Sequence, residues 1–159
     1  LRDLQSVRAY SVLAAGQGYC VGKAALLVAA SRAAGIPARI GFADVTNHLA
    51  SPRTRRAMGT DLFQWHGYAE LSLDGRWLKA SPTFNSSLCA KFGVAPLEFD
   101  GTADALLQAY DAEGRQFMHY HVHHGHFHDV PARFLSTEMQ RLYPGMTAET
   151  EAIVSDARA

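Results

Sequence analysis

Cysteine is scarce in this chain of 159 residues, which contains only Cys20 and Cys89. The two cysteines are 69 positions apart, and neither belongs to a CxxC pair. This spacing excludes a disulfide framework and argues against structural zinc and thioredoxin-like redox chemistry. We therefore expect both thiols to be reduced.

An excess of charge of either sign is also missing. Fifteen basic and fifteen acidic side chains give a formal net charge of zero, so no long-range field favours nucleic acid or an anionic membrane as a partner. No apolar run approaches the ~20 residues that a transmembrane helix needs. We expect a soluble, cytoplasmic protein with a single domain over residues 1–159. Because the chain begins at Leu1 rather than methionine, we allow for a missing upstream segment.

The sequence has no internal repeat, and helical and strand periodicities follow one another along it. Periodicity predicts helices over 3–14, 20–34, 86–92 and 130–143, and strands over 38–45, 65–73, 76–80 and 117–122. The clearest element is the hairpin around Asp74-Gly75, a strong tight-turn dipeptide. The remaining segments are expected to form a long loop (46–62), an extended piece with a turn and a short helix (93–111) and a fraying, helix-prone end (147–159).

Cys20 stands where the glycine-rich stretch GQGYC, residues 16–20, becomes the second predicted helix. A thiolate is the reactive form of cysteine, and a helix N-terminus favours it through partial positive charge and free N–H groups. The N–H of Cys20 and the side chain of Gln17 are candidate donors to a tetrahedral oxyanion. The position also suits a buried core thiol, since free cysteines are among the most buried residues. Position alone leaves both interpretations open, whereas Cys89, without a glycine turn, is expected to be a buried thiol.

His66 opens the first strand of the predicted hairpin, between Trp65 and Tyr68. A histidine at the start of a strand can face a cleft and exchange a proton with a thiol. Taken alone, such a residue is more often structural or on the surface. The hairpin that follows ends in Trp77 and a Pro-Thr corner. We expect Trp77 and Phe84 to lie in the core, and Trp65 to line either a cleft or the core.

The stretches GYCVGKAALLVAASRAAGIPARIGF and WHGYAELSLDGRWLKASPTFN together resemble the core domain of the transglutaminase-like superfamily of papain-like cysteine-protease fold. The resemblance is close over residues 16–85. It implies an α+β fold with a central N-terminal helix packed on an antiparallel β-sheet. It also implies that Cys20 is the nucleophile and His66 the general base that becomes the acid.

Ser81 departs from the family pattern, which commonly has an aspartate before Pro-Thr. An aspartate stabilises the imidazolium that pairs with a thiolate, whereas a hydroxyl orients the ring without supplying charge. Three outcomes are open. Either Ser81 orients His66 unaided, or Asn85 does so as an amide does in papain-like enzymes, or the site is degenerate. We favour Ser81 because it occupies the matching position, and we regard Glu70 as too far along the strand for contact with His66.

Six of the eight histidines fall within HYHVHHGHFHD, residues 119–129. On a strand, His119, His121 and His123 would share one face and Tyr120 the other. Neighbours two apart lie about 7 Å from each other, which is wide for ligands of one metal, so we expect a wet polar face and no metal site. A site built from His124, His126 and His128 in a loop is the alternative.

These observations lead us to expect a cysteine-dependent enzyme of amide or peptide acyl transfer, with hydrolysis as the second step. Its partner would be a peptide or protein amide substrate, and the mechanism needs no cofactor. The alternative, favoured by Ser81, is an inactive domain of the same fold that acts as a binding module. Oligomeric state, substrate identity and the choice of water or amine as acceptor are left open.

Overall fold

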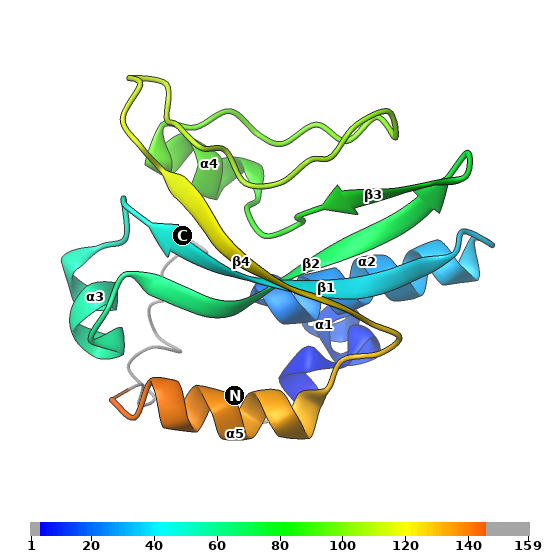
Figure 1. The fold of residues 1–159 in the computed structure, drawn as a ribbon, viewed down its shortest axis with the longest axis horizontal. Coiled ribbons are helices and arrows are strands. Elements are labelled where there is room, and N and C mark those ends of the chain that lie inside the picture. The colour runs from blue at the N-terminus through cyan, green and yellow to red at the C-terminus, as the bar shows by residue number, and fades with distance from the viewer. Residues whose placement is uncertain (1–3, 146–159) are drawn as a thin grey trace.

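A four-stranded antiparallel sheet in the order β3-β2-β1-β4 organises the protein (Figure 1). The structure is a computed structural model and describes residues 4–145. The strands are β1 (Ala38–Asn47), β2 (Leu62–Leu73), β3 (Arg76–Ala80) and β4 (Met118–Phe127). The helices are η1 (Leu4–Val7), α1 (Ala9–Ala15), α2 (Cys20–Ala33), α3 (Pro52–Met58), α4 (Ser86–Phe92) and α5 (Ala132–Leu142).

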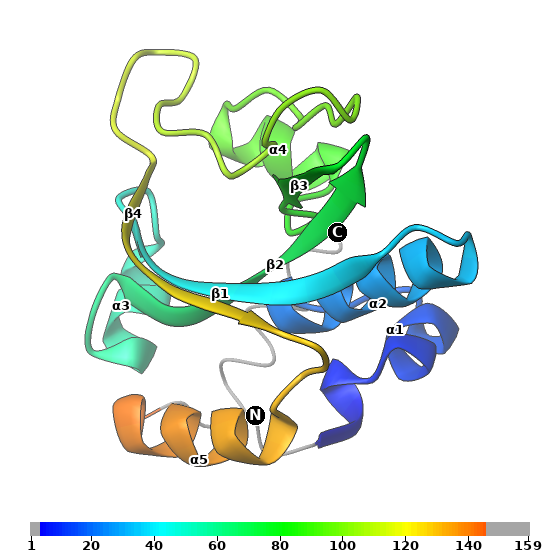
Figure 2. The same ribbon diagram turned by 45° about the vertical axis from the view of Figure 1, so that its right-hand side comes forward.

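Helix α2 packs along one face of the sheet, on the side that also carries α1 and α5 (Figure 2). Its residues are apolar on nearly every side, and Val21, Ala24 and Val28 are buried. They meet a cluster from the sheet and its neighbours that includes Ile40, Phe42, Ala69, Leu71 and Leu135. Full burial of a Val, Leu, Ile or Phe side chain contributes roughly 1.5–3 kcal/mol to the free energy of unfolding. This cluster therefore holds α2 against the sheet. The expected α+β fold with a central helix on an antiparallel sheet is confirmed.

A second hydrophobic cluster lies beside α4. Its buried members are Val45, Cys89, Val94, Leu107, Phe117 and Met118. The rings of Phe84, Phe92 and Phe117 lie 5.6 to 5.7 Å apart and close this cluster. Cys89 is 1% exposed, which confirms the expected buried thiol.

The hairpin and most helices match the sequence prediction, and two segments near them differ. The predicted loop 46–62 contains α3, because Ser51 caps it through the N–H of Thr54, Pro52 begins it and Gly59 ends it at positive φ. The predicted helix 3–14 is divided into η1 and α1 at Arg8, whose backbone is extended.

Three further predictions are wrong or fall outside the structure. Trp77 is 43% exposed and lies 3.9 Å from the guanidinium of Arg39 rather than in the core, because it stands on the outer face of the edge strand β3. Residues 93–111 form no helix and contribute only isolated bridges, such as Ala80 with Ala105. The predicted helix-prone end lies outside the described residues. Within residues 4–145, no single helix is long and apolar enough to cross a membrane.

Candidate active site

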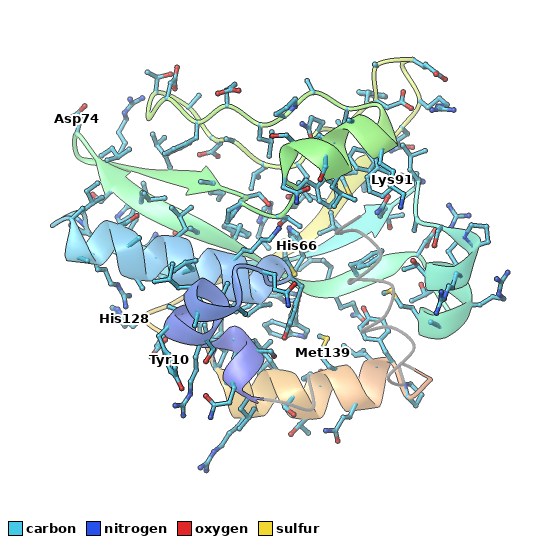
Figure 3. The ribbon with its side chains drawn as sticks, turned by 180° about the vertical axis from the view of Figure 1, so that it is seen from behind. Tyr10, His66, Asp74, Lys91, His128 and Met139 are labelled. Atoms are coloured by element: carbon cyan, nitrogen blue, oxygen red, sulfur yellow. The ribbon has the colours of Figure 1, made fainter. Side chains whose placement is uncertain are left out.

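The N-terminus of α2 meets β2 at Gly67. A Cβ atom at Gly67 would lie 3.0 Å from the Cα of Val21, so any larger residue would push the strand and the helix apart by a few tenths of an ångström. Cys20, the first residue of α2, directly precedes Val21. His66 precedes Gly67 and lies at this end of the helix (Figure 3). The structure therefore brings Cys20 and His66 to one place.

Cys20 is half-buried, with its sulfur among protein atoms. Burial raises the pKa of the thiol, while the N–H groups of Gly67, Val21 and Cys20 and the charge of Lys23 oppose that rise. The N-cap residue Tyr19 makes no side-chain cap hydrogen bond to the first turn of α2. Because burial is the largest of these effects, the pKa of the Cys20 thiol is raised overall, and the resting thiol is protonated at neutral pH.

His66 is 6% exposed and has no carboxylate partner among residues 4–145. Burial lowers its pKa to about 4, so the imidazole is neutral at pH 7. Its Nε2 lies 3.5 Å from the Oγ of Ser81, at the outer limit of a hydrogen bond. The resting pair is therefore a thiol beside a neutral imidazole.

Ser81 follows β3 and is buried, with its N–H donating to the carbonyl of Ala105 at 2.9 Å. Its Oγ lies 3.0 Å from the Oγ1 of Thr83, and the carbonyl of Thr83 accepts a hydrogen bond from Lys23 at 2.8 Å. The Tyr120 ring stands edge-on to His66, with ring centroids 6.3 Å apart. Ser81 thus belongs to the same site, inside a network in which Lys23 is the charged member.

The other two candidates lie in different surroundings. Asn85 is the N-cap of α4, where its side-chain oxygen accepts from the N–H of Leu88 at 2.9 Å and from the hydroxyl of Ser87 at 3.1 Å. This engages the amide oxygen of Asn85, which was the alternative to Ser81 for orienting His66. Gln17 lies in the turn between α1 and α2 and lines a shallow pocket with Lys23 and Leu26.

Asp44 of β1 is a site residue that the sequence analysis missed. Strand β2 has a β-bulge here, with Gln64 and Trp65 opposite the single residue Asp44. Trp65 has a φ of 58°, and its N–H donates to the carboxylate of Asp44 at 3.0 Å. That carboxylate also lies 2.7 Å from the Nε2 of His124, whose ring stacks on Trp65 with centroids 4.0 Å apart. The bulge sets the register of His66, and no periodicity in the sequence reveals it.

The histidines of β4 are arranged differently from the prediction. The strand contains two bulges, at His121 and His124, so its alternation breaks twice. Tyr120 and His123 stack on one another 5.8 Å apart on one face, instead of lying on opposite faces. His124 and His126 lie within the strand rather than in a loop. In the part of the chain that the structure describes, no three His, Cys, Asp or Glu side chains are grouped so as to hold a metal ion.

Glu70 forms an ion pair with Arg39 at 2.6 Å, buried on β2. His66 is not among its partners, in agreement with the expectation that this carboxylate is too far along the strand.

The chain was compared with protein-family models, curated proteins and solved structures. The model of the transglutaminase-like superfamily matches residues 2–82, about half of the chain. No curated protein and no solved structure matches. The matched interval runs from η1 through α2 and the strands β1, β2 and β3, and it holds Cys20, His66 and Ser81. Since this interval contains the central helix and the strands packed on it, the chain belongs to the transglutaminase-like superfamily.

Proposed function

We propose that the protein is a cysteine-dependent acyl-transfer enzyme that hydrolyses an amide or peptide bond. The sulfur of Cys20 attacks the amide carbonyl while His66 accepts the thiol proton. His66 then gives this proton to the departing amine, and the acyl group stays on Cys20 as a thioester. A water molecule, deprotonated by His66, attacks the thioester carbonyl; the C–S bond breaks, the acid is released and His66 returns the proton to the sulfur of Cys20.

The observation that carries this proposal is the close approach of β2 to the first turn of α2, where a Cβ atom at Gly67 would lie 3.0 Å from the Cα of Val21. Cys20 directly precedes Val21 and His66 directly precedes Gly67, so the thiol and the imidazole stand at the same contact. Because the thiol pKa is raised and the imidazole pKa is lowered, the proton rests on sulfur before the substrate binds. Proton transfer to His66 therefore accompanies the attack instead of preceding it. The N–H groups of Cys20 and Val21, at the start of α2, are the candidate donors to the oxyanion.

Acylation by p-nitrophenyl acetate tests this function without knowledge of the natural substrate. We expect a burst of about one p-nitrophenol per chain, with the acetyl group located on Cys20 by mass spectrometry. C20A should lose the burst, whereas the matched variant C89A should keep it. H66Q should slow acylation by about 100-fold or more, because it removes the general base. An undiminished burst in C20A would contradict the proposal.

A second candidate function is a binding module that keeps the fold without the chemistry. The 3.5 Å separation between Ser81 and His66, with no carboxylate in reach among the described residues, favours it. Wild-type protein that binds peptides but shows no acylation of Cys20 would select this function over hydrolysis.

A further inference from the structure

Lys23 lies three residues after Cys20 on α2, so both side chains project from the same side of the helix. Its ammonium group donates to the carbonyl of Thr83 at 2.8 Å. Thr83 in turn contacts Ser81 at 3.0 Å, and Ser81 faces His66. A continuous path of contacts therefore runs from Lys23 to the histidine, while the charge of Lys23 acts on Cys20.

The surroundings of Lys23 differ from those of the two other lysines. Lys79 lies 4.0 Å from the carboxylate of Asp104, and Lys91 is exposed on α4. Lys23 is half-buried and forms no ion pair with a carboxylate among residues 4–145. Burial lowers the pKa of Lys23, and the Coulomb interaction with Cys20 raises it. The hydrogen bond of this partly desolvated ammonium group goes to the neutral carbonyl of Thr83, which supplies no opposite charge, so its Coulomb interaction favours the thiolate form of Cys20.

The titratable groups that face Cys20 come from four elements. They are Lys23 on α2, His66 on β2, Tyr120 on β4 and Tyr143 after α5. Burial raises the pKa of Tyr120 to about 12 and also raises that of Tyr143, while His66 is neutral above about pH 4. Near neutral pH, Lys23 is therefore the cation among these four groups.

We propose that Lys23 is a positioning residue. It takes over part of the role of the aspartate that the family commonly has at the position of Ser81. It stabilises the thiolate of Cys20 directly, where an aspartate at position 81 would stabilise the imidazolium. It also tethers the segment of Ser81 and Thr83 to α2, which keeps the serine hydroxyl at His66. This inference rests on the proposed nucleophilic role of Cys20.

Alkylation of Cys20 by iodoacetamide, measured across pH in the full chain, tests this role without any turnover. The variants are K23M, which removes the charge, K23R, which keeps it, and K91M, a matched control on the surface. We expect K23M to react about tenfold more slowly near neutral pH, with its rate profile shifted to higher pH. K23R should stay within about threefold of wild type, because a guanidinium keeps the charge, and K91M should match wild type. A K23M profile equal to that of wild type would overturn the proposal.

A second measurement covers the case in which K23M does not fold. The ammonium group of Lys23 is titrated by NMR in wild-type protein and in C20A. Since the coupling is reciprocal, Lys23 should titrate at lower pH in C20A, and identical titrations would overturn the proposal. Absence of the p-nitrophenyl acetate burst, with the Lys23 effect intact, would instead reject the acyl-transfer function alone.

Discussion

At the scale of single residues, Ser81 determines how strongly His66 can hold a proton. A hydroxyl offers no charge to the imidazolium, and the long contact of 3.5 Å adds little as a hydrogen bond. Burial then dominates, and the pKa of His66 falls to about 4. A carboxylate at the same position would act against this desolvation.

The variant S81D should therefore raise the pKa of His66 and favour the thiolate–imidazolium pair. We expect the alkylation of Cys20 by iodoacetamide at pH 6 to accelerate by about tenfold, because charged hydrogen bonds exceed neutral ones by ~1 kcal/mol or more. S87D, at the exposed first turn of α4, adds the same charge away from the site and should leave the rate unchanged. A folded S81D protein, as judged by circular dichroism, that reacts at the wild-type rate would refute this account.

At the scale of secondary-structure elements, the bulge in β2 positions His66. The bulge is held by Asp44 at the Trp65 N–H, and by the hydroxyl of Tyr143, which accepts from the N–H of Gln64 at 2.6 Å. Positive φ at Trp65 is unfavourable for an aromatic residue, so these contacts must compensate for the strain. Asp44 on β1 and Tyr143 at the end of α5 thus position His66, the catalytic candidate on β2.

The variant D44A should relax this bulge. It leaves the N–H of Trp65 and the Nε2 of His124 without their shared acceptor, which costs about 1–3 kcal/mol of the free energy of unfolding. We expect Cys20 acylation to slow as well, because His66 follows Trp65 directly. D44N keeps an acceptor oxygen and should lose less than half as much stability. Urea unfolding followed by tryptophan fluorescence measures both variants, and equal stabilities for D44A and wild type would show that the bulge does not depend on Asp44.

At the scale of the whole molecule, the buried neutral His66 makes stability depend on pH. The unfolded chain binds a proton at this residue near pH 6.5, whereas the folded protein does so only near pH 4. Between these values the unfolded state holds more protons, so the free energy of unfolding rises with pH. The stabilisation is complete above about pH 6.5 and is lost as the pH falls toward about 4.

Wild-type protein should therefore lose roughly 3 kcal/mol from this residue between pH 7 and pH 4. Urea titrations at several pH values give this slope. Between pH 7 and pH 4, H66Q should lose less of its free energy of unfolding than wild type does, by the contribution of His66 given above. H128Q, which changes an exposed histidine, should lose as much as wild type. If H66Q and wild type lose stability in parallel, His66 is not the buried neutral group described above.

The sequence predicted the turns and helix starts that depend on residues only a few positions apart. The Asp74-Gly75 turn adopts positive φ at both residues, as its dipeptide indicates, and α2 begins at Cys20 after the glycine turn. Helix α3 was missed because seven residues are too few for a periodic pattern, although Ser51, Pro52 and Gly59 carry its signals. The alternation predicted for β4 failed because each bulge reverses the faces beyond it.

The sequence by itself determined the family, the central helix with Cys20 at its start, and the hairpin that carries His66. These follow from turn chemistry, helix propensity and residue patterns that act over a few positions. Only the tertiary structure decided which groups surround the pair, because Lys23, Asp44 and Tyr120 reach the site through strand register and helix packing. It also decided that the pair is neutral at rest, since the pKa values of Cys20 and His66 follow from burial, and burial belongs to the folded chain as a whole.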